Sequence, residues 1–503
     1  MIDKINTVLG IGKFHKLLIF SLFNCSYLTC FISLSFSYLT KQPQFLCREN
    51  AEQNFEKCDF KEEKFCSTET DSFEYIKDKS HSLDNWSYNF DLYCSNKKYI
   101  VLIGSGFFIG AIIGCIIITP MPDKYGRKIV LKIFLSISCI MHLILLTSFN
   151  PLLISITCIT SGFVSSIYGN FSLYVAEYIP KENSAITMSF IDAVYPFMGF
   201  LEALYFLTIN NWRLLFLFTT IIHIFSTFFV LKYLPESPKW LYSKGKTNEA
   251  IEIMKEIALI NGKEKEVETF LNLNRGKLTD NKEENEENKD ENEENNSSYN
   301  IISIIIHYPS QRLVIFILAF TFFCASFCFY GIILSLENMK GNFFVNSFLS
   351  FFGEMTAELS SGYLSGIYGR TIILKIGGIV GAFGFLGNQL CPNYYLKSIL
   401  LLIAMMGYSS TFNVLYIYSP EIIPSKIRST VSGALYFCGM VAPSFVPFFK
   451  TFIPETFEIL FIIFGFAYSL ACLKLPETLG QENKDELPEE KKEIQEKLLL
   501  ENK

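Results

Sequence analysis

Four acidic residues lie inside long apolar stretches of this sequence. Glu354 and Glu358 are four residues apart, and Asp192 and Glu202 lie in an earlier stretch. An ionisable group inside a membrane costs about 3 kcal/mol or more, so such a group is usually kept for function. Residues four apart share one face of a helix. The acids predict a site for a cation or a proton; the alternative is that they are protonated, hydrogen-bonded struts or lie at the ends of spans.

Aromatic residues accompany these acids. The chain has 50 Phe and 26 Tyr residues, and we expect Tyr330 and Tyr436 to face the same site. The face of a tyrosine ring attracts an organic ammonium group through cation–π contact. Aromatic side chains are also ordinary packing in membrane proteins, and most of them are expected to be structural here.

Other chemistry is not indicated. We find no metal-ligand cluster, phosphate loop or nucleophile triad, and His142 and His223 are interpreted as isolated residues on apolar helices. No basic stripe suggests nucleic acid. The sequence therefore predicts neither an enzyme nor a protein that holds a metal or a cofactor.

The elements that must position these residues are membrane spans. Half of the residues are hydrophobic and only 18% are charged, with a mean hydropathy of +0.30. A helix needs about 20 mainly apolar residues to cross a bilayer. About twelve such stretches occur in two groups of six: 17–40, 99–119, 129–149, 152–175, 185–208 and 213–234, then 312–335, 344–364, 371–390, 396–418, 429–449 and 455–475. The fold class is thus an all-α membrane protein, with the lipid bilayer as its surroundings.

Orientation follows from the short loops. Basic residues concentrate in alternate loops on one side, and such loops usually face the cytosol. This places both chain ends and the 235–311 segment in the cytosol and the 41–98 loop outside, with the plasma membrane as the favoured location. That loop contains Cys47, Cys58, Cys66 and Cys94, which predicts two disulfides in an oxidising space, with the pairing left open.

Domain boundaries follow from the same reading. Residues 1–234 form the first bundle, 235–311 a cytosolic linker, 312–480 the second bundle and 481–503 a cytosolic tail. The linker holds an acidic, low-complexity insert, 273–298, which we expect to be disordered. In the external loop, Asn85-Trp86-Ser87 matches the glycosylation sequon, and Asn85 is the predicted acceptor.

An internal duplication is the strongest evidence for function. Gly126-Arg127 recurs as Gly369-Arg370, Glu177-x-x-Pro recurs as Glu421-x-x-Pro, and Pro-Glu-Ser after the sixth span recurs as Pro-Glu-Thr after the twelfth. Three signatures in one order, at nearly one offset, indicate two homologous six-helix halves. Repeated halves are a transporter architecture that holds its solute between them and exposes it alternately.

The repeated charges predict a cytosolic gate. Ion pairs at the ends of helices can hold two halves together in one state and break in another. The alternative is that the basic residues only follow the positive-inside rule. The predicted gate residues are Asp123, Gly126, Arg127, Lys128, Glu177, Gly369, Arg370, Glu421 and Arg428.

These motifs resemble the major facilitator superfamily. Asp123-Lys-Tyr-Gly-Arg-Lys128 is similar to its first-loop motif, and Pro235-Glu-Ser-Pro-Lys-Trp-Leu241 is similar to the Pro-Glu-Ser-Pro-Arg-Trp-Leu of organic cation/anion transporters. The large external cysteine loop also favours that family. Pro-Glu-Ser-Pro signatures occur in sugar porters too, but the Gln-Gln pair typical of their seventh helix is absent here.

The chain departs from this family at positions that carry charge. Asn413 and Tyr436 align where cation carriers have acids, and Gly366 stands where the second Gly-Arg motif usually has Asp. The resemblance implies a secondary transporter for a small organic ion. The acids favour a cation or a zwitterion, moved by a monomeric carrier with a coupling proton or cation as a further partner. The alternatives are a sugar or polyol porter, and a receptor or scaffold that does not transport.

Overall fold

The computed structural model describes residues 2–48, 54, 56–58, 74–78, 81–167, 174, 175, 177–180, 187, 191–273, 309–339 and 341–480. Within these residues one helix lies on each predicted span. The first six are α2 (Lys13–Thr40), α5 (Lys98–Ile118), α7 (Arg127–Thr147), α8 (Pro151–Ser165), α11 (Val194–Thr208) and α12 (Trp212–Tyr233). The second six are α18 (Pro309–Ser335), α19 (Phe343–Tyr368), α20 (Arg370–Leu390), α21 (Tyr394–Ile422), α22 (Ser425–Ser444) and α24 (Pro454–Cys472).

The described helices differ in length and polarity. Seven of them are long and apolar enough to cross a membrane by length and composition alone. The apolar helices Pro151–Ser165 and Val194–Thr208 are shorter than 18 residues. Helix α19 has 26 residues and carries Glu354 and Glu358, so it brings two acids into the membrane.

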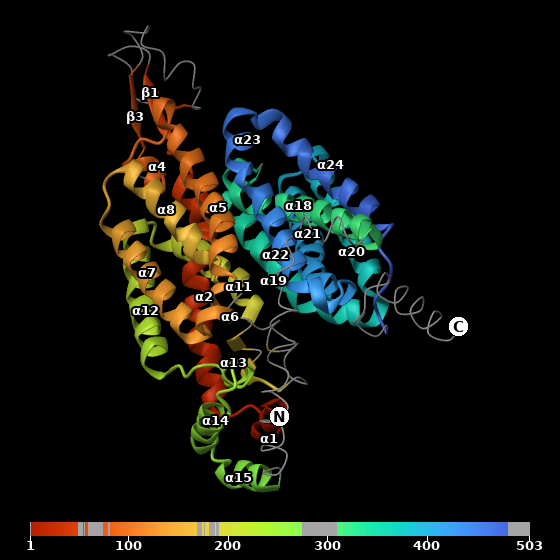
Figure 1. Ribbon diagram of the computed structural model, residues 1–503. Coiled ribbons are helices and arrows are strands. Elements are labelled where there is room, and N and C mark those ends of the chain that lie inside the picture. Colours follow the sequence, from red (N-terminus) through yellow and green to blue (C-terminus); the bar gives the residue numbers. More distant parts are fainter. Residues whose placement is uncertain are drawn as a thin grey trace.

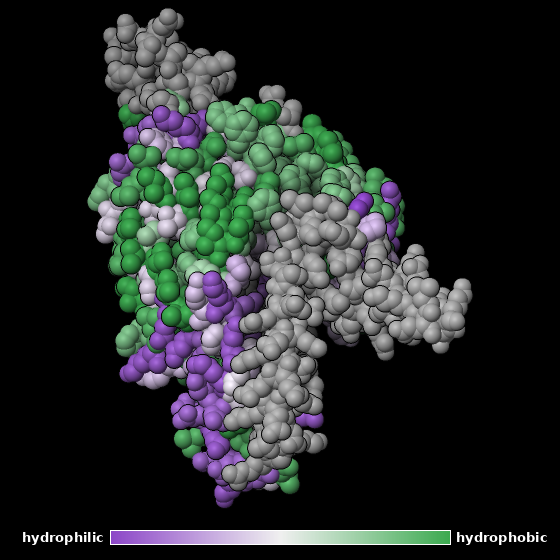
Figure 2. Space-filling view, viewed as in Figure 1, coloured by the Kyte–Doolittle hydropathy of each residue, from purple (hydrophilic) through white to green (hydrophobic). Residues whose placement is uncertain are grey.

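The two groups of helices form two halves that lie side by side (Figure 1). Helix α5 packs against α22 and α23 (Val446–Phe452), α11 packs against α19, and α2 packs against α18. Hydrophobic side chains cover much of the helical flank, and hydrophilic ones gather at the end that carries α14 (Figure 2). This distribution is that of helices surrounded by lipid.

One end of the molecule, the loop side, carries the segment between α2 and α5. Strands β1 (Phe45–Arg48), β2 (Glu56–Cys58) and β3 (Glu74–Lys77) form an antiparallel sheet in the order β2-β1-β3, followed by α4 (Trp86–Asn89) and η1 (Cys94–Asn96). Cys47 and Cys94 are both disulfide-bonded, which confirms the prediction for these two cysteines. Cys66 and the side chain of Cys58 lie outside the described residues, and the pairing stays open.

The glycosylation prediction is wrong for the folded chain. Asn85 is fully buried, and its amide nitrogen donates to the carbonyls of Tyr38 and Lys41 at 2.7 and 2.9 Å. Its amide oxygen accepts from the backbone N–H of Tyr88 and caps α4. The sequon therefore encodes a helix cap, and the nitrogen that a glycan needs is already used.

The opposite end, the linker side, carries α1 (Ile2–Leu9), α13 (Pro238–Ser243), α14 (Thr247–Asn261) and α15 (Glu264–Leu273) (Figure 1). Helix α14 ends at Gly262, whose φ of +72° suits glycine. Helix α1 packs on both α14 and α15. The acidic insert 273–298, apart from Leu273, and the tail 481–503 lie outside the described residues, so their predicted disorder stays a prediction.

Candidate functional site

Two acids of α19 form the centre of the candidate solute site. Glu354 is 0% exposed, and neither of its carboxylate oxygens has a hydrogen-bond partner among the described residues. The Oε2 of Glu358 also lacks such a partner, and the charges that act on Glu358 are those of Glu354 and Asp192. Asp192 precedes α11, which packs against α19, so the three acids meet between the two halves.

Tyrosines of both halves lie near these acids: Tyr195 and Tyr330 near Glu354, and Tyr416 near Asp192. Tyr330 of α18 contacts Phe108 of α5 at 5.2 Å and Phe412 of α21 at 5.9 Å between ring centroids. Tyr416 of α21 continues the series towards Tyr436 of α22 at 6.4 Å. The predicted Tyr330 and Tyr436 thus belong to one aromatic group beside the acids. We call the three acids with Tyr330, Phe412, Tyr416 and Tyr436 the interface cluster.

Glu202 and Asn413 have different roles from those expected. Glu202 is buried and accepts hydrogen bonds of 2.7 Å from the hydroxyls of Tyr27 and Ser35, both on α2. It fixes α11 to α2 inside one half and is not part of the interface cluster. Asn413 donates to the backbone carbonyl of Glu358 and to the Ser361 hydroxyl, so it holds α21 against α19.

The two histidines are not isolated, contrary to the sequence interpretation. Their ring centroids lie 4.8 Å apart, one on α7 and one on α12. The Nδ1 of His142 bonds to the carbonyl of Ser138. They pack α7 against α12, and sequence separation hid this contact.

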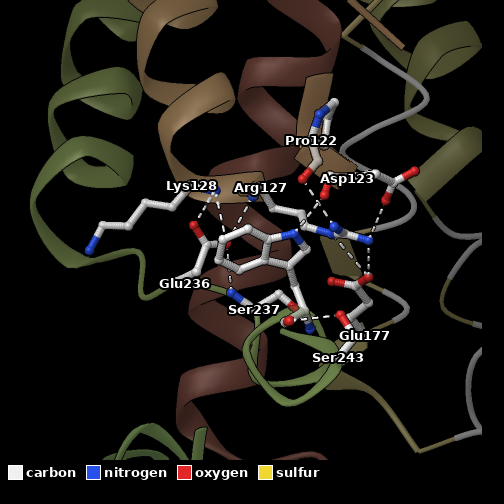
Figure 3. Close-up of polar contacts among 9 residues, drawn as sticks. Pro122, Asp123, Arg127, Lys128, Glu177, Glu236, Ser237 and Ser243 are labelled. Atoms are coloured by element: carbon white, nitrogen blue, oxygen red, sulfur yellow. Dashed lines mark hydrogen bonds and ion pairs between the residues drawn. The ribbon is translucent and has the colours of Figure 1, made fainter. Parts of the chain in front are cut away.

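The first Gly-Arg turn builds a compact charge cluster on the linker side (Figure 3). The guanidinium of Arg127 contacts Asp123 at 2.8 Å and Glu177 at 3.1 Å, and also donates to the carbonyl of Pro122 at 3.0 Å. The Arg127 and Glu177 side chains are only 11% and 8% exposed. This is a nearly dry ion pair, in which loss of one partner leaves a buried charge.

Glu236 completes this turn by capping a helix. Its carboxylate accepts the backbone N–H groups of Arg127 at 2.9 Å and of Lys128 at 3.2 Å, which open α7. A negative charge at the start of a helix is favourable. The carboxylate comes close because Gly126 has no side chain: a Cβ there would lie 2.5 Å from Glu236 Oε2, and its φ is +100°.

The second turn repeats the design. Gly369 has a φ of +106°, and Glu477 accepts the backbone N–H groups of Arg370 at 2.8 Å and of Thr371 at 3.0 Å. Burial alone raises the pKa of Glu477, but hydrogen bonds from the Thr371 hydroxyl and from backbone N–H groups outweigh it, and the pKa lies below its ordinary value. Arg370 pairs with Glu421 at 3.2 Å.

Residues 86–447, well over half of the chain, match the model of the Major Facilitator Superfamily. The chain belongs to the Major Facilitator Superfamily. It is therefore a membrane transporter and not an enzyme.

Relatives support the organic-ion resemblance. Solute carrier family 22 member 15-like of Xenopus laevis is 28% identical over 394 residues, which cover 75% of this chain and 76% of that protein. Organic anion transporter 3 of Homo sapiens is 27% identical, with 79% and 74% covered. Organic cation/carnitine transporter 4 of Arabidopsis thaliana is 25% identical, with 83% and 78% covered. The sequence resemblance to organic cation/anion transporters is confirmed.

Solved structures agree on the fold. An inward-open form of the xylose transporter XylE of E. coli has a TM-score of 0.61 at 16% identity, with 93% of this chain and 97% of that chain covered. The human organic anion transporter MFSD10 has a TM-score of 0.56 at 12% identity, with 91% and 98% covered. The major facilitator fold predicted from the repeat is thus confirmed.

The two halves of this major facilitator fold meet tightly on the loop side. The Ser37 hydroxyl donates to the carbonyl of Ile333 at 2.6 Å, and the ring of Tyr38 packs against Phe343 at 5.0 Å. Gly104 leaves no room for a side chain, since a Cβ there would lie 2.6 Å from Pro447. These contacts join α2 and α5 to the second half and close the loop side.

The gate prediction named Glu177 as a partner for the first Gly-Arg motif, and the structure contains the Arg127–Glu177 pair. The prediction also expected ion pairs among Arg127, Lys128, Glu177, Glu421 and Arg428 that hold the two halves together. Among the described residues, however, Arg127 and Arg370 each pair with a glutamate of their own half. In each half the start of one helix and the end of the following antiparallel helix lie on the same side, which brings the arginine and the glutamate together. The side chain of Arg428 lies outside the described residues, and its gate role stays a prediction.

Sequence reasoning missed the caps and the loop-side charges. Glu236 and Glu477 lie in the repeated Pro-Glu-Ser/Thr motifs, which were visible, but the N–H groups that they bind are 109 and 107 residues away. Glu337 and Lys450 form a buried ion pair, which no sequence motif predicted. A repeated motif indicates that its residues matter, but only the folded chain shows which groups those residues bind.

Proposed function

We propose that the chain transports a small organic cation by alternating access, with Glu354 and Glu358 binding its ammonium group. The observation that carries this proposal is the interface cluster. Both carboxylate oxygens of the buried Glu354 and the Oε2 of Glu358 have no hydrogen-bond partner among the described residues. Asp192 adds a third negative charge near Glu358, and the ring of Tyr330 lies close to Glu354 and Glu358. A carboxylate buried in a membrane must be neutralised. An organic cation can pair with the carboxylate and at the same time lie against the face of a tyrosine ring.

The same cluster argues against an organic anion, although several relatives are named anion transporters. An anion would have to approach three acids in a region of low dielectric, where repulsion between like charges is strong. A zwitterion is acceptable because its ammonium group can take the place of the cation. This choice rests on charge, because the relatives by name include both kinds of transporter.

We further propose that a proton replaces the cation when the site empties. Glu354 and Glu358 share one helix face and cannot both remain charged and unpaired in that setting. Protonation of one carboxylate would neutralise the empty site during its return. Cation transport would then be coupled to a proton gradient.

The orientation is also part of the proposal. Disulfides at Cys47 and Cys94 form in oxidising spaces, which supports an extracellular loop side and a cytosolic linker side in the plasma membrane. The loop-side contacts close the path to the outside in this conformation. Transport requires the halves to part on the loop side and to close on the linker side.

An uptake panel in proteoliposomes tests this function. We expect tetraethylammonium to be taken up, faster with an opposing proton gradient, and dicarboxylates and polyols not to be taken up. Glu354→Gln and Glu358→Gln should lower uptake by about tenfold or more. Glu202→Gln is the matched control, because it changes an equally buried glutamate outside the cluster.

Three outcomes would reject the proposal. Polyol uptake without organic-ion uptake would indicate a sugar or polyol porter. Anion uptake that survives both glutamine variants would show that the acids do not bind the solute. No flux of any solute from a folded protein would favour a receptor or scaffold.

A further inference from the structure

A cavity lies on the loop side, and no residue of the interface cluster lines it. Its volume is about 490 Å³. One wall belongs to the first half and includes Gln42, Tyr93 and Lys97; the other belongs to the second half and includes Ser335 and Glu337. The disulfide-bonded Cys94 also lines it, so a covalent link anchors one wall. The cavity exists where the two halves meet.

Polar atoms of this cavity lack partners. Glu337 uses one carboxylate oxygen for the buried ion pair with Lys450 and a 3.4 Å contact from the Thr40 hydroxyl. Its other oxygen, and the hydroxyl of Ser335, have no hydrogen-bond partner among the described residues. The Glu337 side chain is 7% exposed and Ser335 is 1% exposed. Buried acceptors of this kind are costly unless something donates to them.

The charged residues that line the cavity indicate which class of ligand fits it. Two acids, Glu337 and Glu458, and two bases, Lys97 and Lys450, line the cavity. A pure cation or anion would meet equal numbers of like and opposite charges there. The unpaired oxygens of Glu337 and Ser335 are buried at the cavity wall, and a small rotation of each side chain lets them accept from the ammonium N–H of a small zwitterion whose carboxylate points towards the lysines.

We propose that this cavity is a regulatory site for a small zwitterion with a primary ammonium group. Because both halves supply its walls, the cavity is lost when the halves part on the loop side. A ligand that binds only the closed form stabilises that form and opposes opening. At ten times its Kd, the ratio of closed to open molecules rises about 11-fold. The ligand therefore inhibits transport without occupying the solute site.

This inference needs the halves to part on the loop side, but not the proposed identity of the transported solute. Binding of radiolabelled γ-aminobutyrate to the purified full chain is the first readout, and inhibition of uptake from the loop side is the second. Ethanolamine, butyrate and glycine betaine complete the probe panel, since each lacks the carboxylate, the ammonium or the N–H donors. We expect γ-aminobutyrate to bind at least tenfold more tightly than any of the three.

Ser335→Ala should weaken γ-aminobutyrate binding about tenfold and leave basal uptake unchanged. Ser444→Ala is the control, because that serine bonds only within its own helix. Glu337→Gln would leave Lys450 buried without its partner, so Glu458→Gln serves as the second variant and should also weaken binding. Glu358→Gln should retain γ-aminobutyrate binding, which separates this site from the solute site.

The proposal is overturned if none of the probes binds, or if Ser335→Ala and Glu458→Gln bind γ-aminobutyrate as the unmodified chain does. It is also overturned if γ-aminobutyrate loses its binding in Glu358→Gln. Should no transport be found at all, the binding measurements still decide the question.

Discussion

The two Gly-Arg turns share one backbone design but differ in how their arginines are paired. Both glycines have a φ near +100°, and both following helices are capped by a glutamate from a Pro-Glu motif. Arg127 then contacts Asp123, Glu177 and a carbonyl. Arg370 contacts Glu421, but its Nη1 is buried and has no hydrogen-bond partner among the described residues.

The cause of the difference is a single position. Asp123 precedes Arg127 by four residues, and Gly366 stands at the same distance before Arg370. A Cβ at Gly366 would lie 3.6 Å from the unpaired Nη1, so an aspartate there could reach it. The arginine–glutamate pair is also wetter in the second half, with side chains 17% and 29% exposed. We infer that the first turn is a fixed strut and the second is the looser one.

Removing each arginine should give the largest difference in stability loss between the two turns. Arg127→Gln leaves Glu177 buried without its charge partner, at an expected cost of about 3 kcal/mol. Arg370→Gln should cost only about 1 kcal/mol, since its partner is partly hydrated and keeps a 2.6 Å hydrogen bond from the Thr478 hydroxyl. Thermal unfolding in detergent measures both. Equal losses of stability in the two variants would show that the two turns do not differ in this way.

The glycines test the part of the design that the turns share. Gly126→Ala and Gly369→Ala each force an unfavourable backbone conformation, at about 1–3 kcal/mol. Each added Cβ would also approach the capping carboxylate within 3 Å, at 2.5 and 2.7 Å. We expect similar drops in melting temperature for both variants. A loss at one turn alone would show that the caps are not equivalent.

Placing an acid at position 366 should stabilise the second turn and make it more like the first. Gly366→Asp gives Arg370 a second carboxylate and should stabilise the protein by about 0.5–1 kcal/mol. Gly366→Ala is the control, because it makes the same backbone change without the charge. A gain of the same size in both variants would mean that helix propensity, and not the ion pair, explains it.

The smallest expected effect concerns pH. The pKa of Glu477 is lowered in the folded chain, so its contribution to stability is present above its ordinary pKa and is lost as pH falls through the lower folded value. Melting curves of the unmodified chain and of Glu477→Gln should therefore differ at pH 6 and converge as the pH falls below about 4.5. A difference that persists unchanged at pH 3 would contradict this role.

The sequence predicted most of the architecture because its signals are local. Apolar stretches of membrane length, the repeated Gly-Arg motif and the i, i+4 spacing of Glu354 and Glu358 can each be read within one helix or turn. The spans, the two halves and the pairing of Arg127 with Glu177 followed from them.

What failed depends on contacts between distant segments. Glu202 has the same sequence context as Glu354, an acid in an apolar helix, and only the fold shows that two hydroxyls of α2 bind it. Asn85 fits a sequon, and only burial shows that its side chain is used as a cap. The loop-side cavity joins residues from 42 to 458, and no pattern in the sequence connects them.

Equilibrium binding of radiolabelled tetraethylammonium to the purified chain tests the central claim most directly. The account predicts that Glu354→Gln and Glu358→Gln each weaken binding about tenfold or more, equivalent to at least about 1.4 kcal/mol, and that Glu202→Gln stays within about twofold of the unmodified chain. Unchanged binding in both α19 variants, or an equal loss in Glu202→Gln, would contradict it.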